Sequence, residues 1–362
     1  MRVILTSPRK RSAHLATFSA PNGVDSRLVK LTGNGADLIA ERDPEGTTYS
    51  VYAPAQAAGE SVTYDLEPID SAPPCTSISA EQGDEQVEIS LCDSPFMTFK
   101  YGGDVVKPTI NPILTPGGVN MLREPMAAWV EGEHPWQRGL TLMQGAINGI
   151  DCWNEKDIET FGRTDQDSLE VSHGPVSLTL SSDNSWYCGD TKLMTDHRSY
   201  RLFDTGRDAA VLDIALTLKA SEGPVTIGNT KEGGFLCIRV NPTMNASDGG
   251  TMRNAYGAAD EKGCWSFPSH WMDYYGPVGD ETAGFAIFDH PDNFRYPTTW
   301  HVRGYGLFAP NCWMFKPDHQ IAVGESLTFR WRVTVHAGDT GRADMATRFL
   351  DYVDGLRLEA EA

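Results

Sequence analysis

The amino-acid sequence predicts an all-β protein, built as a large antiparallel β-sandwich with a small N-terminal β domain and a C-terminal helix. Apolar and polar residues alternate with a period of two in many short segments, which is the pattern of half-buried strands. Turn-forming residues separate these segments. The 35 glycines and 22 prolines fit many short strands joined by tight turns.

The alternation is clearest in residues 86–91, 175–180, 211–218 and 327–335. Turn sequences lie between such segments, for example Asp-Gly-Gly at residues 248–250. The period changes near the C-terminus, where Met345, Phe349, Val353 and Leu356 recur at helical spacing. One face of a helix in this segment can therefore pack on the sheets.

We divide the chain into four parts. Residues 1–75 contain short strands with few large core residues, which predicts a small β domain. Residues 76–85 end in an acidic stretch and follow a Pro- and Ser-rich one, so we expect a linker. Residues 86–340 are expected to form the β-sandwich that carries the functional cleft, and residues 341–362 the C-terminal helix and tail.

The net charge of the chain limits the classes of molecule that it can bind. The formal net charge is −19, with 49 acidic against 30 basic residues and no basic stripe, which argues against binding to nucleic acid or to an anionic membrane surface. The longest apolar stretches, such as 211–218, are far shorter than the ~20 residues that span a bilayer. We expect a neutral or weakly charged small molecule as the partner, while the oligomeric state stays open.

The seven cysteines are far apart, odd in number and without a CxxC pair. This pattern is typical of reduced thiols, and no apolar segment of signal-peptide length follows the basic N-terminal residues, so we expect a cytoplasmic protein. Phosphate-binding loops of the GxGxxG or GxxxxGK type are absent from the sequence, so no cofactor is expected.

Four segments interrupt the alternation and gather chemically active residues. In the first, residues 133–153, His134 precedes a proline that favours an extended backbone, and Arg138 follows before a strand. These side chains either form part of a sugar-binding lip or hydrogen-bond to loop carbonyls where a strand begins.

In the second segment, residues 229–235, two glycines follow Lys231 and Glu232. The backbone can therefore bend there and project Glu232 from a sheet edge as a candidate general base. The alternative for Glu232 is a solvated ion pair with Lys231.

In the third segment, residues 269–277, alternation places Trp271 and Asp273 on the same face of a strand. Asp273 is either an acceptor for a substrate hydroxyl or a cross-strand hydrogen-bond partner. The fourth segment, residues 288–306, combines two histidines with Asp, Trp, Arg and Tyr, and is the densest of the four.

Three of these imidazoles, His134, His290 and His301, could bind zinc if they converged. No HxH or HExxH spacing supports such a site, so we expect no metal.

Blocks in these segments resemble the signature blocks of a bacterial family called PmoA-like or "methane oxygenase": HPWQRGL and NGIDCW (134–140, 148–153), NTKEGGF (229–235), HWMDYYGP (270–277), FDHPDN (288–293) and TTWHVRGYGLFA (298–309). The resemblance is collinear from about residue 95 to 340. It implies a core similar to the galactose-mutarotase-like supersandwich, whose cleft binds sugars, and a place in carbohydrate metabolism. It also implies a set of cleft residues: His134, Arg138, Lys231, Glu232, Asp273, His290, His301 and Arg303.

One departure from the family pattern matters. Members commonly have His-Pro-His-His-Arg-Gly where this chain has Trp136 and Gln137 in place of the two middle histidines. The substitution argues against a multi-histidine metal site and favours stacking of a sugar on Trp136.

The leading hypothesis is a carbohydrate-active enzyme of the epimerase, lyase or hydrolase type, acting on a sugar or keto-sugar by acid–base chemistry. The catalytic candidates are Glu232 as the base, His134 and His301 as proton donors, and His290. The substrate-binding candidates are Arg138, Trp136, Lys231, Trp271, Asp273, Trp300, Arg303 and Tyr305. The alternatives are a carbohydrate-binding protein without catalysis, or a metal-dependent oxidoreductase.

Overall fold

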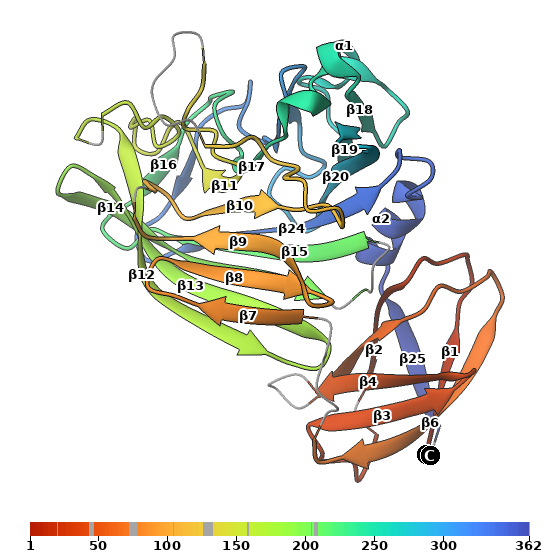
Figure 1. Ribbon diagram of the computed structural model, residues 1–362. Coiled ribbons are helices and arrows are strands. Elements are labelled where there is room, and N and C mark those ends of the chain that lie inside the picture. Colours follow the sequence, from red (N-terminus) through yellow and green to blue (C-terminus); the bar gives the residue numbers. More distant parts are fainter. Residues whose placement is uncertain are drawn as a thin grey trace.

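The computed structural model describes residues 1–19, 21–42, 47–71, 78–103, 105–125, 133–157, 159–203, 205 and 209–361. These residues form a small β-barrel beside a larger β-sandwich (Figure 1). The predicted all-β class, with large antiparallel sheets and a C-terminal helix, is confirmed. No helix in the described part of the chain is long and apolar enough to cross a membrane.

The barrel closes in the strand order β1-β25-β2-β5-β4-β3-β6. Its strands are β1 (Arg2–Thr6), β2 (His14–Ser19), β3 (Leu28–Gly33), β4 (Ala36–Arg42), β5 (Thr48–Ala53), β6 (Ser61–Ile69) and β25 (Leu356–Glu361). Alternate residues such as Val3, Leu31 and Val51 are fully buried inside it. The last strand pairs antiparallel with β1 and parallel with β2, so both ends of the chain belong to this barrel (Figure 1). Closure leaves the barrel without a free edge.

Two eight-stranded sheets form the sandwich. Sheet I has the order β21-β22-β17-β11-β10-β9-β8-β7. Its strands are β7 (Ile78–Gln82), β8 (Gln86–Leu91), β9 (Ser94–Lys100), β10 (Thr109–Ile113), β11 (Leu140–Met143), β17 (Phe235–Arg239), β21 (Trp300–Arg303) and β22 (Leu307–Pro310). Strand β7 lies within the segment 76–85 that was expected to be a linker, so the sheet starts earlier than this division placed it.

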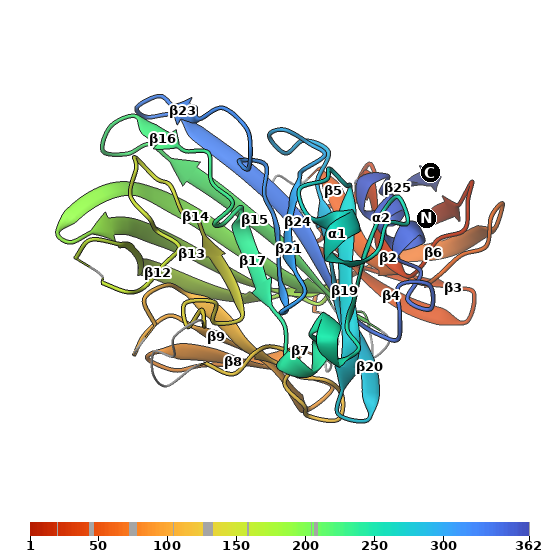
Figure 2. The same cartoon turned by 90° about the horizontal axis from the view of Figure 1, so that it is seen from above.

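Sheet II has the order β12-β13-β14-β15-β24-β20-β19-β18. Its strands are β12 (Gly162–His173), β13 (Ser177–Cys188), β14 (Thr191–Phe203), β15 (Ala209–Lys219), β18 (Thr251–Asn254), β19 (Trp271–Val278), β20 (Glu281–Asp289) and β24 (Ser326–Ala337). Strands β16 (Val225–Ile227) and β23 (His319–Ile321) form a small separate pair. Figure 2 shows the two large sheets layered over one another.

Aromatic side chains fill much of the space between the two sheets. The ring of Phe235, at the start of β17, packs edge-on against Trp186 and Trp313 and lies 5.6 Å from Phe329, centroid to centroid. All four residues are at most 3% exposed. Each large ring buries 150–250 Å², so this cluster is a main contribution to the stability of the sandwich.

Helix α2 (Met345–Val353) joins the sandwich to the barrel, and α1 (Asp260–Cys264) is a short turn of helix beside β18. Phe349 of α2 packs edge-on against Phe288 of sheet II. On the other side of the helix, Asp351 is buried and accepts hydrogen bonds from Arg11 and Ser12 of the barrel. The helix is shorter than the predicted 341–362 segment because residues 356–361 pair with β1 and β2 instead.

Candidate functional site

A pocket of about 300 Å³ lies at the β21 end of sheet I and gathers half of the site residues that the sequence predicts. We call it the site pocket. It is lined by His134, Lys231, Glu232, Glu261, His301, Arg303 and Tyr305. Six of these seven were candidates from the sequence, and they come from three segments that are far apart in the chain.

Strand β21 places two of these side chains by simple alternation. Trp300 and Val302 point into the core between the sheets and are 0% exposed. His301 and Arg303 therefore point to the opposite, outer face of sheet I. Tyr305 follows on the turn that leads into β22.

Two glycines position Lys231 and Glu232 in front of β17. Gly233 and Gly234 have φ angles of 117° and 119°, a region that other residues rarely adopt. A Cβ atom on Gly234 would lie 2.0 Å from the carbonyl oxygen of Pro310, so the chain can pass here only without a side chain. The buried amide of Asn311 donates to the carbonyl oxygens of Thr230 and Lys231, at 3.1 Å each, and holds the loop against sheet I.

A stack of planar groups holds His134 in place. The rings of His134 and Tyr305 are nearly parallel, with centroids 5.2 Å apart. The guanidinium of Arg239 lies 4.4 Å from the Tyr305 ring centroid, a cation–π contact, and donates to the side-chain oxygen of Gln137. Arg123 donates to the backbone carbonyls of His134 and Gln137. The buried arginines Arg239 and Arg123 therefore fix the position of His134, the first through Tyr305 and the second through the backbone.

Both imidazoles of the site pocket are neutral at neutral pH. Burial, together with the nearby positive charges of Arg303 and Lys231, lowers the pKa of His301 to about 3. Burial also lowers the pKa of His134, and Arg239 adds to this, while the charge of Glu232 acts in the opposite direction. His301 is only 2% exposed, and its Nδ1 atom has no hydrogen-bond partner among the described residues.

The charged groups of the site pocket form two opposite pairs. Arg303 Nη1 lies 2.7 Å from Glu261 Oε1, and the other carboxylate oxygen of Glu261 accepts from the backbone N–H of Gly304 at 2.7 Å. Lys231 Nζ lies 3.2 Å from Glu232 Oε1. The sequence analysis offered an ion pair with Lys231 as one of two alternatives for Glu232, and this ion pair is present. Both of its residues line the site pocket.

Other predicted residues lie outside the lining of the site pocket. Asp273 is fully buried and accepts hydrogen bonds from His336 at 2.9 Å and Thr340 at 2.6 Å. Trp271 packs in the apolar cluster beneath α2. His290 lies edge-on to the ring of Tyr352, also of α2. These three candidates hold the C-terminal segment on sheet II.

The remaining candidates lie in the core or beside the pocket. Trp300 is fully buried, and its indole N–H donates to the carbonyl of Ser269 at 3.0 Å. Trp136 is 7% exposed and packs edge-on against His134, so it supports the pocket without forming a flat open surface. Arg138 forms an ion pair of 2.7 Å with Glu155.

Three functional groups at or behind the site pocket were missed in the sequence. Glu261 stands in a charged turn of the chain, and nothing local distinguishes it from a solvated acidic residue. Arg123 and Arg239 occur singly, outside the four segments. Among the described residues, no group of three or more His, Cys, Asp or Glu side chains is arranged to hold a metal ion.

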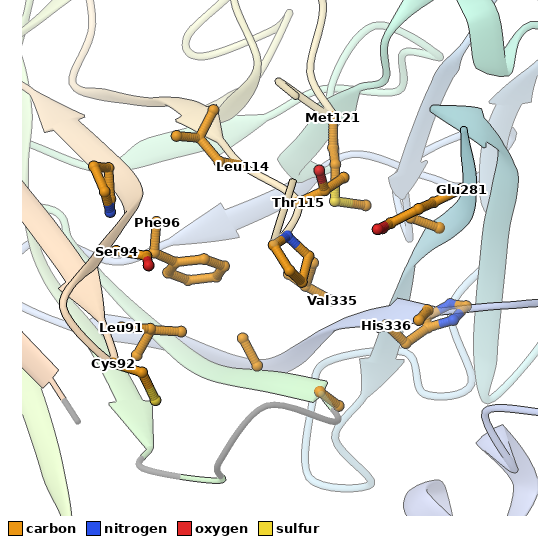
Figure 3. A pocket seen from close by; sticks show the side chains of 16 residues that line it. Leu91, Cys92, Ser94, Phe96, Leu114, Thr115, Met121, Glu281, Val335 and His336 are labelled. Atoms are coloured by element: carbon orange, nitrogen blue, oxygen red, sulfur yellow. The ribbon is translucent and has the colours of Figure 1, made fainter. Parts of the chain in front are cut away.

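A second cavity, of about 170 Å³, has a different character (Figure 3). Its walls are mainly apolar and include Leu91, Phe96, Leu114, Met121 and Val335. None of the site candidates from the sequence lines it. We place the candidate site in the site pocket, because its lining combines four charged residues with two imidazoles, as acid–base chemistry requires. The second cavity has Glu281 and His336 in a mainly apolar wall, and His336 is hydrogen-bonded to Asp273.

The fold and this pocket define an all-β protein with a closed barrel, a two-sheet sandwich and a charge-balanced pocket on the outer face of one sheet. A family model matches residues 86–349, and the chain belongs to this family, which is described as a family of unknown function (DUF6807). The match runs from β8 into α2 and so covers the sandwich apart from β7, and the whole site pocket. No curated protein matches the chain.

Proposed function

We propose that this protein is a carbohydrate-active enzyme that uses acid–base chemistry on a neutral sugar or keto-sugar. The observation that carries the proposal is the meeting of Glu232, His134 and His301 with Arg303 in one pocket. A carboxylate, neutral imidazoles and a guanidinium are the groups that proton abstraction and oxyanion stabilisation require.

The charge balance of the site pocket favours a neutral ligand. Lys231 and Arg303 offset Glu232 and Glu261, and both histidines are uncharged at neutral pH. An anionic or cationic ligand would leave one charge without a partner, at a cost in desolvation. A hydroxyl group, in contrast, can hydrogen-bond to these charged groups and to a neutral imidazole without adding a charge to the pocket.

The proposed chemistry assigns each group a role. The Glu232 carboxylate removes a proton from the carbon next to a sugar carbonyl, and the C–H electron pair becomes the π bond of an enolate. Arg303 and an N–H of His301 stabilise the enolate oxygen. In an elimination the enolate re-forms the carbonyl, its C=C electron pair becomes a double bond between the α and β carbons, and the C–O bond at the β carbon breaks. The leaving oxygen takes the N–H proton of His134, which is replaced by the proton that Glu232 removed. In an epimerisation His134 gives its N–H proton to the other face of the same carbon, and the proton on Glu232 restores His134.

The aromatic residue that lines the site pocket is not one of the three tryptophans of the sequence hypothesis. Trp136, Trp271 and Trp300 are buried or packed elsewhere, whereas Tyr305 is half-buried and lines the pocket. The faces of the Tyr305 ring contact His134 and Arg239, so we assign to Tyr305 a contact with the sugar through its ring edge rather than by stacking. The resemblance to the PmoA-like family and to the mutarotase-like supersandwich stays a prediction that is compatible with this assignment.

The six described cysteines are free thiols, which supports our proposal of a cytoplasmic location.

Proton NMR of the purified protein mixed with monosaccharides, disaccharides and 3-keto-glycosides tests the proposal. Accelerated anomeric exchange, elimination or cleavage is the expected result. Glu232→Gln should abolish most of it, and Glu88→Gln, at an exposed position of β8, should leave it unchanged. Selective line broadening without any reaction would replace the enzyme by a carbohydrate-binding protein. Spectra that are unchanged for every sugar tested would contradict both the enzyme and the carbohydrate-binding protein.

A further inference from the structure

Phe315 is an exposed aromatic residue in a strained position next to the site pocket. It is 65% exposed, at the tip of the turn that follows Asn311. Its φ angle is 58°, in the left-handed region, where a bulky side chain is a genuine outlier. Such strain persists only where the surrounding structure enforces it, and it is concentrated at functional sites.

The structure fixes this turn to the pocket loop by hydrogen bonds. The side-chain oxygen of Asn229 accepts from the N–H of Phe315 at 2.9 Å, and Asn229 stands two residues before Lys231. From the other side, the buried side chain of Asn311 accepts from the N–H groups of Trp313 and Met314 and donates to the pocket loop. Phe315 is therefore held in a defined place relative to Lys231 and Glu232.

Ring contacts continue from Phe315 to the wall of the site pocket. Phe315 and Trp265 meet edge to face, with centroids 5.8 Å apart. Arg303, which lines the pocket, lies with its guanidinium carbon 5.1 Å from the Trp265 ring centroid. The indole Nε1 of Trp265 is buried and has no hydrogen-bond partner among the described residues. Phe315, Trp265 and Arg303 thus form one continuous surface, which we call the aromatic shelf.

We propose that the aromatic shelf is a second binding subsite, which takes a further ring of the substrate beyond the one in the site pocket. This inference rests on the proposed function and specifies its substrate class: a disaccharide or an aryl glycoside rather than a free monosaccharide. A sugar ring presents an apolar C–H face, and an aromatic aglycone presents a flat ring, so either can stack on Phe315. An exposed phenylalanine that the backbone holds rigidly loses little conformational entropy when it binds.

Binding of matched glycosides tests the subsite. The probes are methyl glycosides of glucose, galactose, mannose and xylose, the 4-fluorophenyl glycosides of the same sugars, and the disaccharides cellobiose, lactose and mannobiose. Dissociation constants come from ¹⁹F and saturation-transfer NMR. The wild-type protein should bind the two-ring member of a pair about three- to tenfold more tightly than the methyl glycoside, which is the range for one aromatic stacking contact.

Variants separate stacking from other effects. Phe315→Ala should bring the two-ring and methyl glycosides to nearly equal affinity and leave the methyl glycoside unaffected. Phe315→Tyr, which keeps a ring, should retain the difference. Val323→Ala removes an apolar side chain that is equally exposed, at 65%, and lies in the turn before β24, so it should change nothing. The thermal unfolding midpoint of each variant shows that it is folded.

The outcomes distinguish this inference from the proposed function. A two-ring preference that survives Phe315→Ala overturns the subsite and leaves the proposed function standing. Binding of 4-fluorophenyl glycosides that depends on Phe315, together with no binding of any methyl glycoside or disaccharide, keeps the shelf as an aryl site and overturns the carbohydrate function. A preference for disaccharides over aryl glycosides identifies the second ring as a sugar. No binding of any probe contradicts both proposals.

Discussion

Arg303 of β21 and Glu261 of α1 form an ion pair of 2.7 Å that joins the edge of sheet I to the wall of the site pocket. Glu261 also accepts from the backbone N–H of Gly304, so both of its oxygens are used. The pair is partly exposed, and such pairs contribute only about 0–1 kcal/mol to stability. Its main effect is to fix the orientation of the guanidinium of Arg303 in the wall of the site pocket.

Replacing Glu261 by Gln should therefore affect ligands more than folding. We expect a change of less than about 1 kcal/mol in the free energy of unfolding, and about a tenfold loss of sugar affinity or turnover. Urea denaturation and NMR titration measure the two effects. Glu222→Gln, in a surface turn, is the control. A Glu261→Gln protein that binds normally would show that the orientation of Arg303 does not depend on Glu261.

His301 predicts a specific dependence of stability on pH. Its folded-state pKa is about 3, below the ordinary value of 6.5, so the unfolded chain binds a proton that the folded protein does not. The stabilisation is present above about pH 6.5 and is lost as the pH falls toward 3, by up to roughly 5 kcal/mol. In His301→Gln, the fall of the urea midpoint between pH 6.5 and pH 4 should be shallower than in the wild type.

Gly234 should tolerate no side chain. In Gly234→Ala the added Cβ atom meets the carbonyl oxygen of Pro310 at 2.0 Å, so the loop that carries Glu232 must move. We expect a loss of more than about 2 kcal/mol in stability. Gly324→Ala is the control, because Gly324 also has a positive φ, of 81°, but has no atom within 4 Å of the added Cβ. Thermal midpoints that fall equally in both variants would show that backbone conformation alone matters.

Asp273 should be structural. It is buried against His336 and Thr340, and the ring of His336 crosses over Gly284 to reach it. Asp273→Ala leaves the buried imidazole without its partner, so we expect a loss of about 3 kcal/mol or more in stability. Ligand affinity per folded molecule, measured by NMR, should not change. A specific loss of binding in a variant of normal stability would restore Asp273 as a substrate-binding residue.

Deleting residues 356–362 should open the barrel. Strand β25 lies between β1 and β2, so its removal exposes the edges of both strands. Limited proteolysis should then cleave within residues 1–71 at rates much higher than in the full chain. Ligand binding at the site pocket should persist, because none of its lining residues belongs to the barrel. Unchanged resistance to protease would show that the barrel closes in another way.

Much of the sandwich could be predicted because the alternation that marks its strands is a pattern of neighbouring residues. The period-2 alternation in 211–218 and 327–335 places apolar side chains on one face of each strand, and these segments are β15 and β24. The same alternation put His301 and Arg303 on one face. It also implies that Trp300, one residue before His301, points the other way, and Trp300 is in the core.

The barrel strand β25 shows where local pattern fails. Leu356 fits the helical spacing of Met345, Phe349 and Val353, so the helix was expected to continue. In the structure the chain leaves α2 and inserts between β1 and β2, more than 330 residues away in sequence. Only the pairing partners, which are remote, make a strand the favourable conformation there.

The sequence by itself determined the fold class and the chemical inventory of the site: alternation sets which face of a strand is buried, and glycines mark where the backbone must bend. The tertiary structure decided which of these residues meet. It brought His134, Glu232 and His301 to one pocket, added Glu261 to its lining, and placed Arg239 behind Tyr305. It directed Asp273, Trp271 and His290 to the support of the C-terminal segment. The physical reason is that alternation and turn formation act between neighbours in the sequence, whereas a pocket depends on the pairing order of strands that are distant in the chain.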